Sequence, residues 1–85
     1  MGYHIAEIKK GKFGDISKLQ EELDELKDCE DQQNKIMALV ELSDLYGAIK
    51  GYLVKHIPSM TMEDLRIMSE ATERAFKDGT RIPRN

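Results

Sequence analysis

Two acidic stretches in the middle of this chain have the spacing that a metal site built on helices would need. They are residues 21–25 (EELDE) and 41–44 (ELSD). Glu22 precedes Glu25 by three positions, and Glu41 precedes Asp44 by the same interval. In a helix, residues at this spacing lie on one side. Carboxylate oxygens are the ligands that Mg²⁺ and Mn²⁺ prefer, so these four side chains are candidate ligands for a divalent cation.

The second stretch is the more informative one, because it lies within an apolar segment. On a helical wheel, Glu41 and Asp44 share their arc with Met37, Val40 and Leu45. Carboxylates in such an arc are costly to bury unless something positive pairs with them, and a divalent cation is an economical partner. Residues 21–25 taken alone have a plainer interpretation, a solvated helix face, in which Asp24 is surface and Glu21 is either surface or a supporting residue.

Three helices are expected to carry these residues. The first starts at Asp15 or at Ser17, both competent N-caps; with Ser17 as the cap, Gln20 completes a capping-box pattern. It fades in the polar run of residues 28–33. The third helix is expected over residues 61–77, with Thr61 and Asp64 at its start. Residues 1–14 are interpreted as an N-terminal arm or loop.

The second helix is expected from about Asn34 to His56, where Pro58 ends it. Its apolar residues cover nearly the whole circumference, which is typical of a helix buried on nearly all sides. Small residues at positions 47, 48 and 51 would allow another helix to approach closely. An 85-residue chain can hardly enclose such a helix by itself. Self-association is therefore expected, as a dimer or a tetramer.

Length and cysteine content lead to the same expectation. Residues 1–85 form one domain, and a chain of this size buries only about 60% of its unfolded surface. The single Cys29 has no partner for an internal disulfide and no neighbouring Cys or His cluster for zinc. His4 and His56 are far apart in the sequence and are assigned no metal role. We therefore predict an all-α fold, a small bundle of about three helices completed by oligomerisation.

Charge and hydropathy exclude several classes of partner. The formal net charge of −3 argues against nucleic acid as the main partner, because phosphate backbones are bound through excess Lys and Arg. No apolar run of about 20 residues is present, so no membrane span is expected. The first residues lack the pattern of a secretory signal, so a cytoplasmic location is expected.

The acidic pattern also resembles the signature of a known family. Glu-Glu-x-x-Glu, followed after 15 residues by Glu-x-x-Asp, is similar to the motif of the MazG-like all-α nucleoside-triphosphate pyrophosphohydrolases, and the resemblance covers about residues 15–57. It implies an all-α NTP pyrophosphatase-like fold. It also implies an Mg²⁺ cofactor, with Mn²⁺ possible, held by Glu22, Glu25, Glu41 and Asp44.

The implied reaction is the attack of water on the α-phosphorus of a (d)NTP, which gives the nucleoside monophosphate and pyrophosphate. A carboxylate that is not fully committed to the metal would accept the proton of the water, and Glu21 and Glu25 are the catalytic candidates. A narrower substrate, such as dUTP or a modified nucleotide, stays open. The alternative is a non-catalytic helical module for protein interaction or assembly, whose acids only keep it soluble.

Basic residues near the chain end complete the predicted site. A triphosphate that enters a site of four carboxylates needs positive charge beyond that of the metal. Arg74, Lys77 and Arg81 are the candidates for binding the substrate phosphates. Cations near a helix C-terminus are also favoured by the helix dipole, which is the plainer explanation of the first two.

Overall fold

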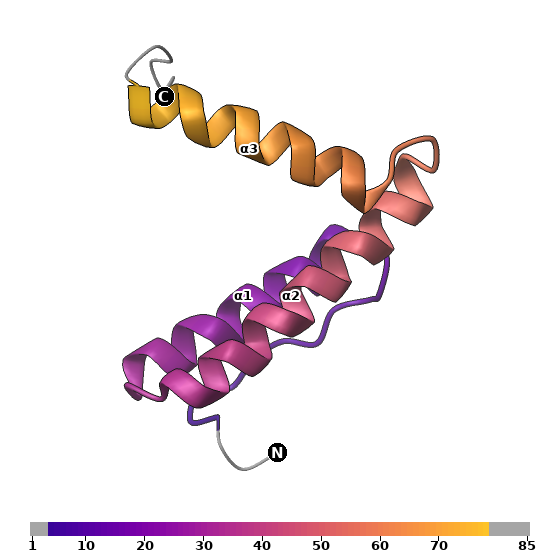
Figure 1. The fold of residues 1–85 in the computed structure, drawn as a ribbon. Helices are drawn as coiled ribbons and strands as arrows, with labels where there is room; N and C mark the ends of the chain where they lie inside the picture. Colours follow the sequence, from indigo (N-terminus) through magenta and orange to yellow (C-terminus); the bar gives the residue numbers. More distant parts are fainter. Residues whose placement is uncertain (1–3, 79–85) are drawn as a thin grey trace.

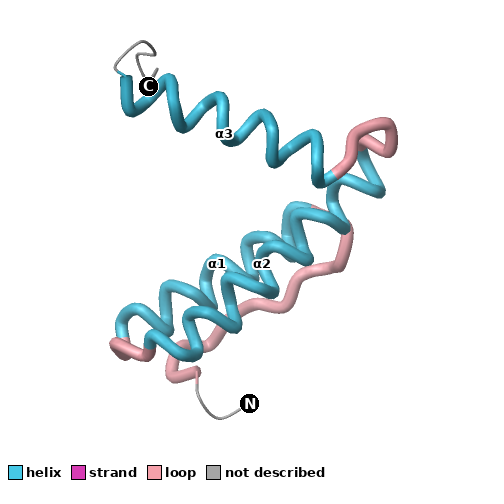
Figure 2. The backbone as a smooth tube through the Cα atoms, in the orientation of Figure 1, coloured by secondary structure: helices cyan, strands magenta, loops and turns pink. Residues whose placement is uncertain are grey.

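The computed structural model describes residues 4–78, and all of its regular structure is helical (Figures 1 and 2). The helices are α1 (Ile16–Asp31), α2 (Lys35–His56) and α3 (Met62–Asp78). No strand occurs within residues 4–78. The expected all-α fold of three helices is thereby confirmed. Within the same residues, no helix is both long enough and apolar enough to cross a bilayer.

The ends of the helices follow from local sequence signals. Asn34 caps α2, since its Oδ1 accepts from the Met37 amide (3.1 Å). At the start of α3, Thr61 and Asp64 form the reciprocal capping box: each side chain accepts from the backbone amide of the other (3.1 and 2.9 Å). Pro58 follows the end of α2 closely. These boundaries lie within one residue of those expected.

Of the two expected N-cap residues of α1, Asp15 and Ser17, the structure has Asp15. Asp15, in an extended conformation, is the N-cap residue, and its carboxylate accepts from Lys55 Nζ (2.5 Å) rather than from a helix amide. The Ser17 hydroxyl accepts from the Lys12 amide (3.0 Å), so the capping box of Ser17 and Gln20 is not formed. Both side chains therefore join α1 to other segments.

The helices α1 and α2 pack side by side as an antiparallel hairpin, and the space between them is unusually acidic (Figure 1). Its buried apolar residues are Cys29, Ala48 and Leu53. Four carboxylate side chains are buried with them: Glu21, Glu22, Asp28 and Glu41. Burial of unpaired charge is costly, so the partners of these groups decide whether the hairpin is stable.

Residues 4–14 form an arm that runs along the hairpin (Figure 2). The amides of Ile5 and Ala6 donate to Asp28 on α1 (2.9 and 3.2 Å), and the amide of Gly11 donates to Glu21 (2.9 Å). Farther along, the arm lies on α2, where a Cβ built at Gly51 would lie 2.5 Å from the Phe13 ring. The small residue at position 51 therefore admits the arm and not another helix.

Beyond the hairpin, α3 diverges and its C-terminal end lies away from both other helices (Figure 1). Within residues 4–78, α2 is therefore left partly exposed, in agreement with the expectation that one chain of this size can hardly enclose it. Its exposed apolar side chains include Ile36 (77% exposed), Leu39 (68%) and Tyr46 (61%). The cause is geometric: one hairpin and an arm cannot surround a helix of 22 residues.

Candidate metal centre

The candidate ligands come from the facing sides of α1 and α2. Glu22 and Glu25 lie on α1, and Glu41 and Asp44 lie on α2. Glu41 is completely buried and Glu22 is 4% exposed, whereas Asp44 is exposed. The cluster is therefore closed at its inner end and reaches solvent at Asp44.

The carboxylate oxygens are close enough to share a cation. One oxygen each from Glu22, Glu41 and Asp44 lies within 4.8 Å of the other two, and the same holds for Glu21, Glu22 and Glu25. Ligands at about 2.0–2.1 Å from Mg²⁺ place their oxygens roughly 3–4 Å apart, which is near the spacing present here. Glu22 belongs to both groups and joins them.

One buried oxygen of the cluster, Glu22 Oε1, lacks a hydrogen-bond donor among the described residues. Glu22 Oε2 lies 3.1 Å from Lys18 Nζ, but Glu22 Oε1 is buried with no hydrogen-bond partner among the described residues. A buried carboxylate oxygen left in this way is expensive, and a divalent cation would satisfy it. The donor set is all oxygen, so these residues fit a hard cation such as Mg²⁺ or Mn²⁺.

The pKa of Glu25 is raised, which indicates that several negative charges lie close together in the cluster. Burial, together with the neighbouring carboxylates of Glu22 and Glu41, raises the pKa of Glu25 to about 7. Neighbouring negative charges make the ionisation of another carboxyl group less favourable. The carboxyl groups of the cluster are therefore not all ionised easily at the same time. A bound cation would relieve the same repulsion.

Glu21 lies in a different environment, although it adjoins the same cluster. Burial opposes its ionisation, but the Gly11 amide and the Lys18 ammonium outweigh burial and hold the pKa of Glu21 below its usual value. Lys18 Nζ lies 3.1 Å from Glu21 Oε1, and Lys10 Nζ lies 3.6 Å from Glu21 Oε2. Glu21 is thus an anchor for the arm and for two lysines, and not a surface residue.

The structure adds His4, to which sequence reasoning assigned no role. Its Nδ1 lies 3.0 Å from Asp28 Oδ2, and its Nε2 lies 3.2 Å from Glu41 Oε2 and 3.8 Å from Glu25 Oε2. The arm therefore brings an imidazole into the acidic cluster. The only signal in the sequence was indirect, the need of a buried Glu41 for a partner, and it could not point to a residue 37 positions away.

Two of the predicted phosphate-binding residues, Arg74 and Lys77, are not brought to the carboxylates within the described part of the chain. Arg74 and Lys77 lie near the exposed end of α3, where Lys77 pairs with Glu73 (3.2 Å). Arg81 lies outside the described residues. Among the described residues, Lys18 pairs with Glu22 of the carboxylate cluster, and both Lys18 and Lys10 pair with the adjoining Glu21.

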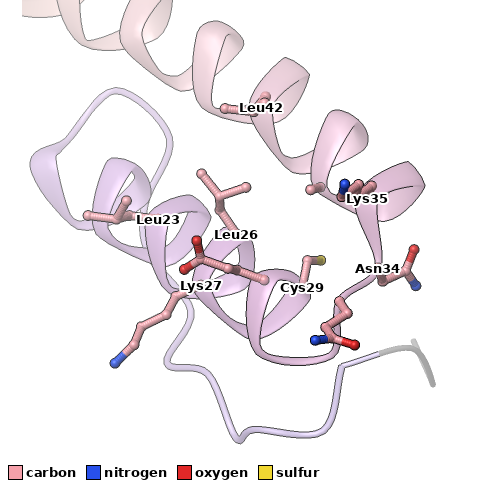
Figure 3. Close-up of a pocket in the computed structure, with 10 residues that line it drawn as sticks. Leu23, Leu26, Lys27, Cys29, Asn34, Lys35 and Leu42 are labelled. Carbon is pink, nitrogen blue, oxygen red and sulfur yellow. The ribbon is translucent and has the colours of Figure 1, made fainter.

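A cavity of about 920 Å³ is lined by residues of α1 and α2 (Figure 3). Leu23, Leu26 and Leu42 supply its apolar lining, and Lys27 and Lys35 border it. Its volume suits a small molecule or a packed side of another helix. Glu22, Glu25, Glu41 and Asp44 do not line it, whereas Cys29 does.

Comparison with known proteins does not assign the chain to a family. No protein-family model, curated protein or solved structure matches the chain. The arguments about function therefore rest on the residues and their geometry.

Proposed function

We propose that this protein hydrolyses nucleoside triphosphates, (d)NTPs, to the monophosphate and pyrophosphate in a reaction that depends on Mg²⁺ or Mn²⁺. One observation carries the proposal: carboxylates from two facing helices converge, and a buried oxygen of Glu22 has no hydrogen-bond donor among residues 4–78. The MazG-like resemblance of the acidic motif supports the choice of reaction.

Glu22, Glu41 and Asp44 would hold the metal, with Glu25 adjoining. The cation would supply positive charge that neutralises and orients the phosphate oxygens of the substrate. The exposed position of Asp44 gives a triphosphate access to this charge from solvent. Lys18, paired with Glu22, adds a cation at the edge of the cluster.

Glu25 is better suited than Glu21 to accept the proton of the attacking water. A general base works best when its pKa lies near the working pH, and the pKa of Glu25 is about 7. The carboxylate of Glu21 is already occupied by the Gly11 amide and by Lys18. In the reaction the water oxygen bonds to the α-phosphorus, the bond from that phosphorus to the bridging oxygen breaks, and pyrophosphate leaves.

Arg74, Lys77 and Arg81 remain proposed contacts of the substrate phosphates. The first two lie on the diverging α3, so they would reach a carboxylate cluster only in an assembly of two or more chains (Figure 1). The proposed enzyme is therefore a homo-oligomer.

The second candidate function, a non-catalytic interaction module, is favoured by a separate observation. Apolar side chains on α2 and α3 are exposed, among them Leu39, Tyr46 and Phe76. Such surfaces are typical of protein contacts. An interaction module does not explain why carboxylates are buried between α1 and α2, so we place this function second.

The test is to incubate the full chain with each common (d)NTP, and with several modified ones, in the presence of Mg²⁺ and then to identify the products. We expect pyrophosphate and a monophosphate from at least one substrate, and no turnover with EDTA. Glu41→Gln should lower kcat at least about 100-fold at unchanged helix content, because a ligand charge is lost while the shape remains. Asp24→Asn is the matched control, since Asp24 is bonded to Gln20 outside the cluster.

Two outcomes would reject the proposal. Orthophosphate as the sole inorganic product would exclude this mechanism. Absence of turnover with every triphosphate would favour the interaction module.

A further inference from the structure

A second group of possible metal ligands lies against the carboxylate cluster and differs from it in chemistry. His4 from the arm, Cys29 from α1 and Glu41 from α2 each offer one atom, and these atoms lie within 4.8 Å of one another. Cys29 and Glu41 are completely buried. Nitrogen, sulfur and oxygen donors from three separate segments thus meet at one point.

The orientation of His4 is fixed from its far side. Asp28 is a carboxylate that also accepts from Ile5, Ala6 and Gln32. Burial works against ionisation of Asp28, but the hydrogen bonds from His4 and from these groups hold its pKa below the usual value. A carboxylate can only accept, so His4 Nδ1 donates to Asp28. Nε2 is thereby turned toward Glu41, in the manner of the carboxylate–histidine pairs that support metal ligands.

Cys29 is a fully buried thiol on α1 that forms no disulfide. Burial, together with the nearby charges of Glu41 and Asp28, raises the pKa of this thiol. A coordinating metal ion replaces the thiol proton, which is released to solvent.

We propose that His4 Nε2, Cys29 Sγ and a Glu41 oxygen bind a divalent transition-metal ion of the Zn²⁺ type, with Asp28 as the residue that orients His4. Thiolate and imidazole select zinc-like ions over Mg²⁺, which takes oxygen ligands. Glu25 Oε2, 3.8 Å from His4 Nε2, is a further carboxylate oxygen near these ligands. The site goes beyond the proposed function and shares with it the ligand Glu41.

The experiment uses Co²⁺ as a spectroscopic probe, added to the reduced full chain. We expect one Co²⁺ per chain, with thiolate-to-cobalt charge-transfer absorption and release of a proton. Cys29→Ser should abolish the charge-transfer absorption, and His4→Gln should weaken binding at least about tenfold. Asp28→Asn should weaken it by about 10–100-fold, the usual effect of losing a supporting partner. His56→Gln is the matched control and should bind like the parent protein.

The outcome that overturns the proposal is binding without charge-transfer absorption, or binding that His4→Gln leaves unchanged. If Cys29→Ser loses helix content, His4→Gln decides, because residue 4 lies outside the helices. Glu22→Gln separates this site from the proposed enzyme activity, since it should stop hydrolysis and keep the cobalt spectrum. A cobalt spectrum in a protein that hydrolyses no triphosphate would uphold this site and reject the enzyme.

Discussion

Glu25 links the carboxylate cluster to the pH dependence of stability. Its pKa of about 7 in the folded chain lies above the ordinary value of 4.5, because burial and the charges of Glu22 and Glu41 favour the protonated form. Between these two pH values the folded state binds more protons than the unfolded state. The contribution of Glu25 to stability is therefore fully present below about pH 4.5 and is lost as the pH rises through about 7.

The first prediction concerns this loss. In EDTA, the free energy of unfolding of the parent chain should fall by up to about 3 kcal/mol between pH 5 and pH 8 through Glu25. Glu25→Gln should flatten this decline, because a neutral amide replaces a carboxyl group that the fold prefers to keep protonated. Urea denaturation at both pH values measures the difference.

Two controls make this result specific. Glu30→Gln, an exposed acid on the same helix, should keep the parent profile. Adding Mg²⁺ at pH 8 should restore stability to the parent chain more than to Glu25→Gln, because the ion relieves the same repulsion. An identical decline in Glu25→Gln would show that Glu25 is not its source.

At the scale of elements, the arm and α1 depend on each other. Asp28 accepts from the amides of Ile5 and Ala6 and from His4, so one side chain fixes three groups at the start of the arm. Glu21 fixes the arm again at Gly11. The arm in turn covers buried carboxylates that the hairpin alone would expose to solvent.

The second prediction is that Asp28→Asn releases the first part of the arm and leaves the helices intact. Amide hydrogen exchange at Ile5 and Ala6 should become at least about tenfold faster, because both amides lose a charged acceptor. Exchange at Gly11 should change less, since Glu21 still holds it. Asp31→Asn, an exposed residue at the end of α1, is the control, and equal exchange in both variants would contradict the role given to Asp28.

At the scale of the whole molecule, the chain exposes surface that a monomer would not be expected to leave open. Leu39, Leu42 and Tyr46 follow one another at helical spacing on α2, and all three are exposed. The apolar cavity of Figure 3 includes Leu42 and lies between α1 and α2. The first half of α3 lies near Tyr46, but α3 then diverges from α2, and all three side chains stay exposed (Figure 1).

The third prediction is therefore that the protein associates with itself through α2. Light scattering at micromolar concentration should give at least twice the 9.7 kDa mass of the chain. Leu39→Glu should shift the population toward the monomer, because a charge would be buried in an apolar contact. Lys50→Glu, an exposed polar position on the same helix, should not.

A stable monomer of 9.7 kDa would contradict this prediction. It would also remove the route by which Arg74 and Lys77 could reach a carboxylate cluster. The proposed enzyme would then have to bind phosphate through Lys18 and Lys10.

Local sequence signals were enough to predict the helices and part of the acidic cluster. Caps and stops act within a few residues, so Asn34, Pro58 and the pair Thr61–Asp64 could be interpreted locally. Helical periodicity also indicated that Glu41 would face the core, and it is completely buried. Periodicity did not determine the burial of Glu21, which depends on the arm that crosses it.

Which groups from distant parts of the chain come into contact depends on how the segments pack. His4 reaches Asp28 and Glu41 across 24 and 37 residues, and no periodicity relates an irregular arm to a helix. The direction of α3 and the exposure of α2 could not be predicted from local patterns either. Helical periodicity identifies an apolar face, but it does not identify the surface that packs against that face. The spacing of residues determined which side chains share a face of each helix. The packing of the segments determined which other groups contact that face.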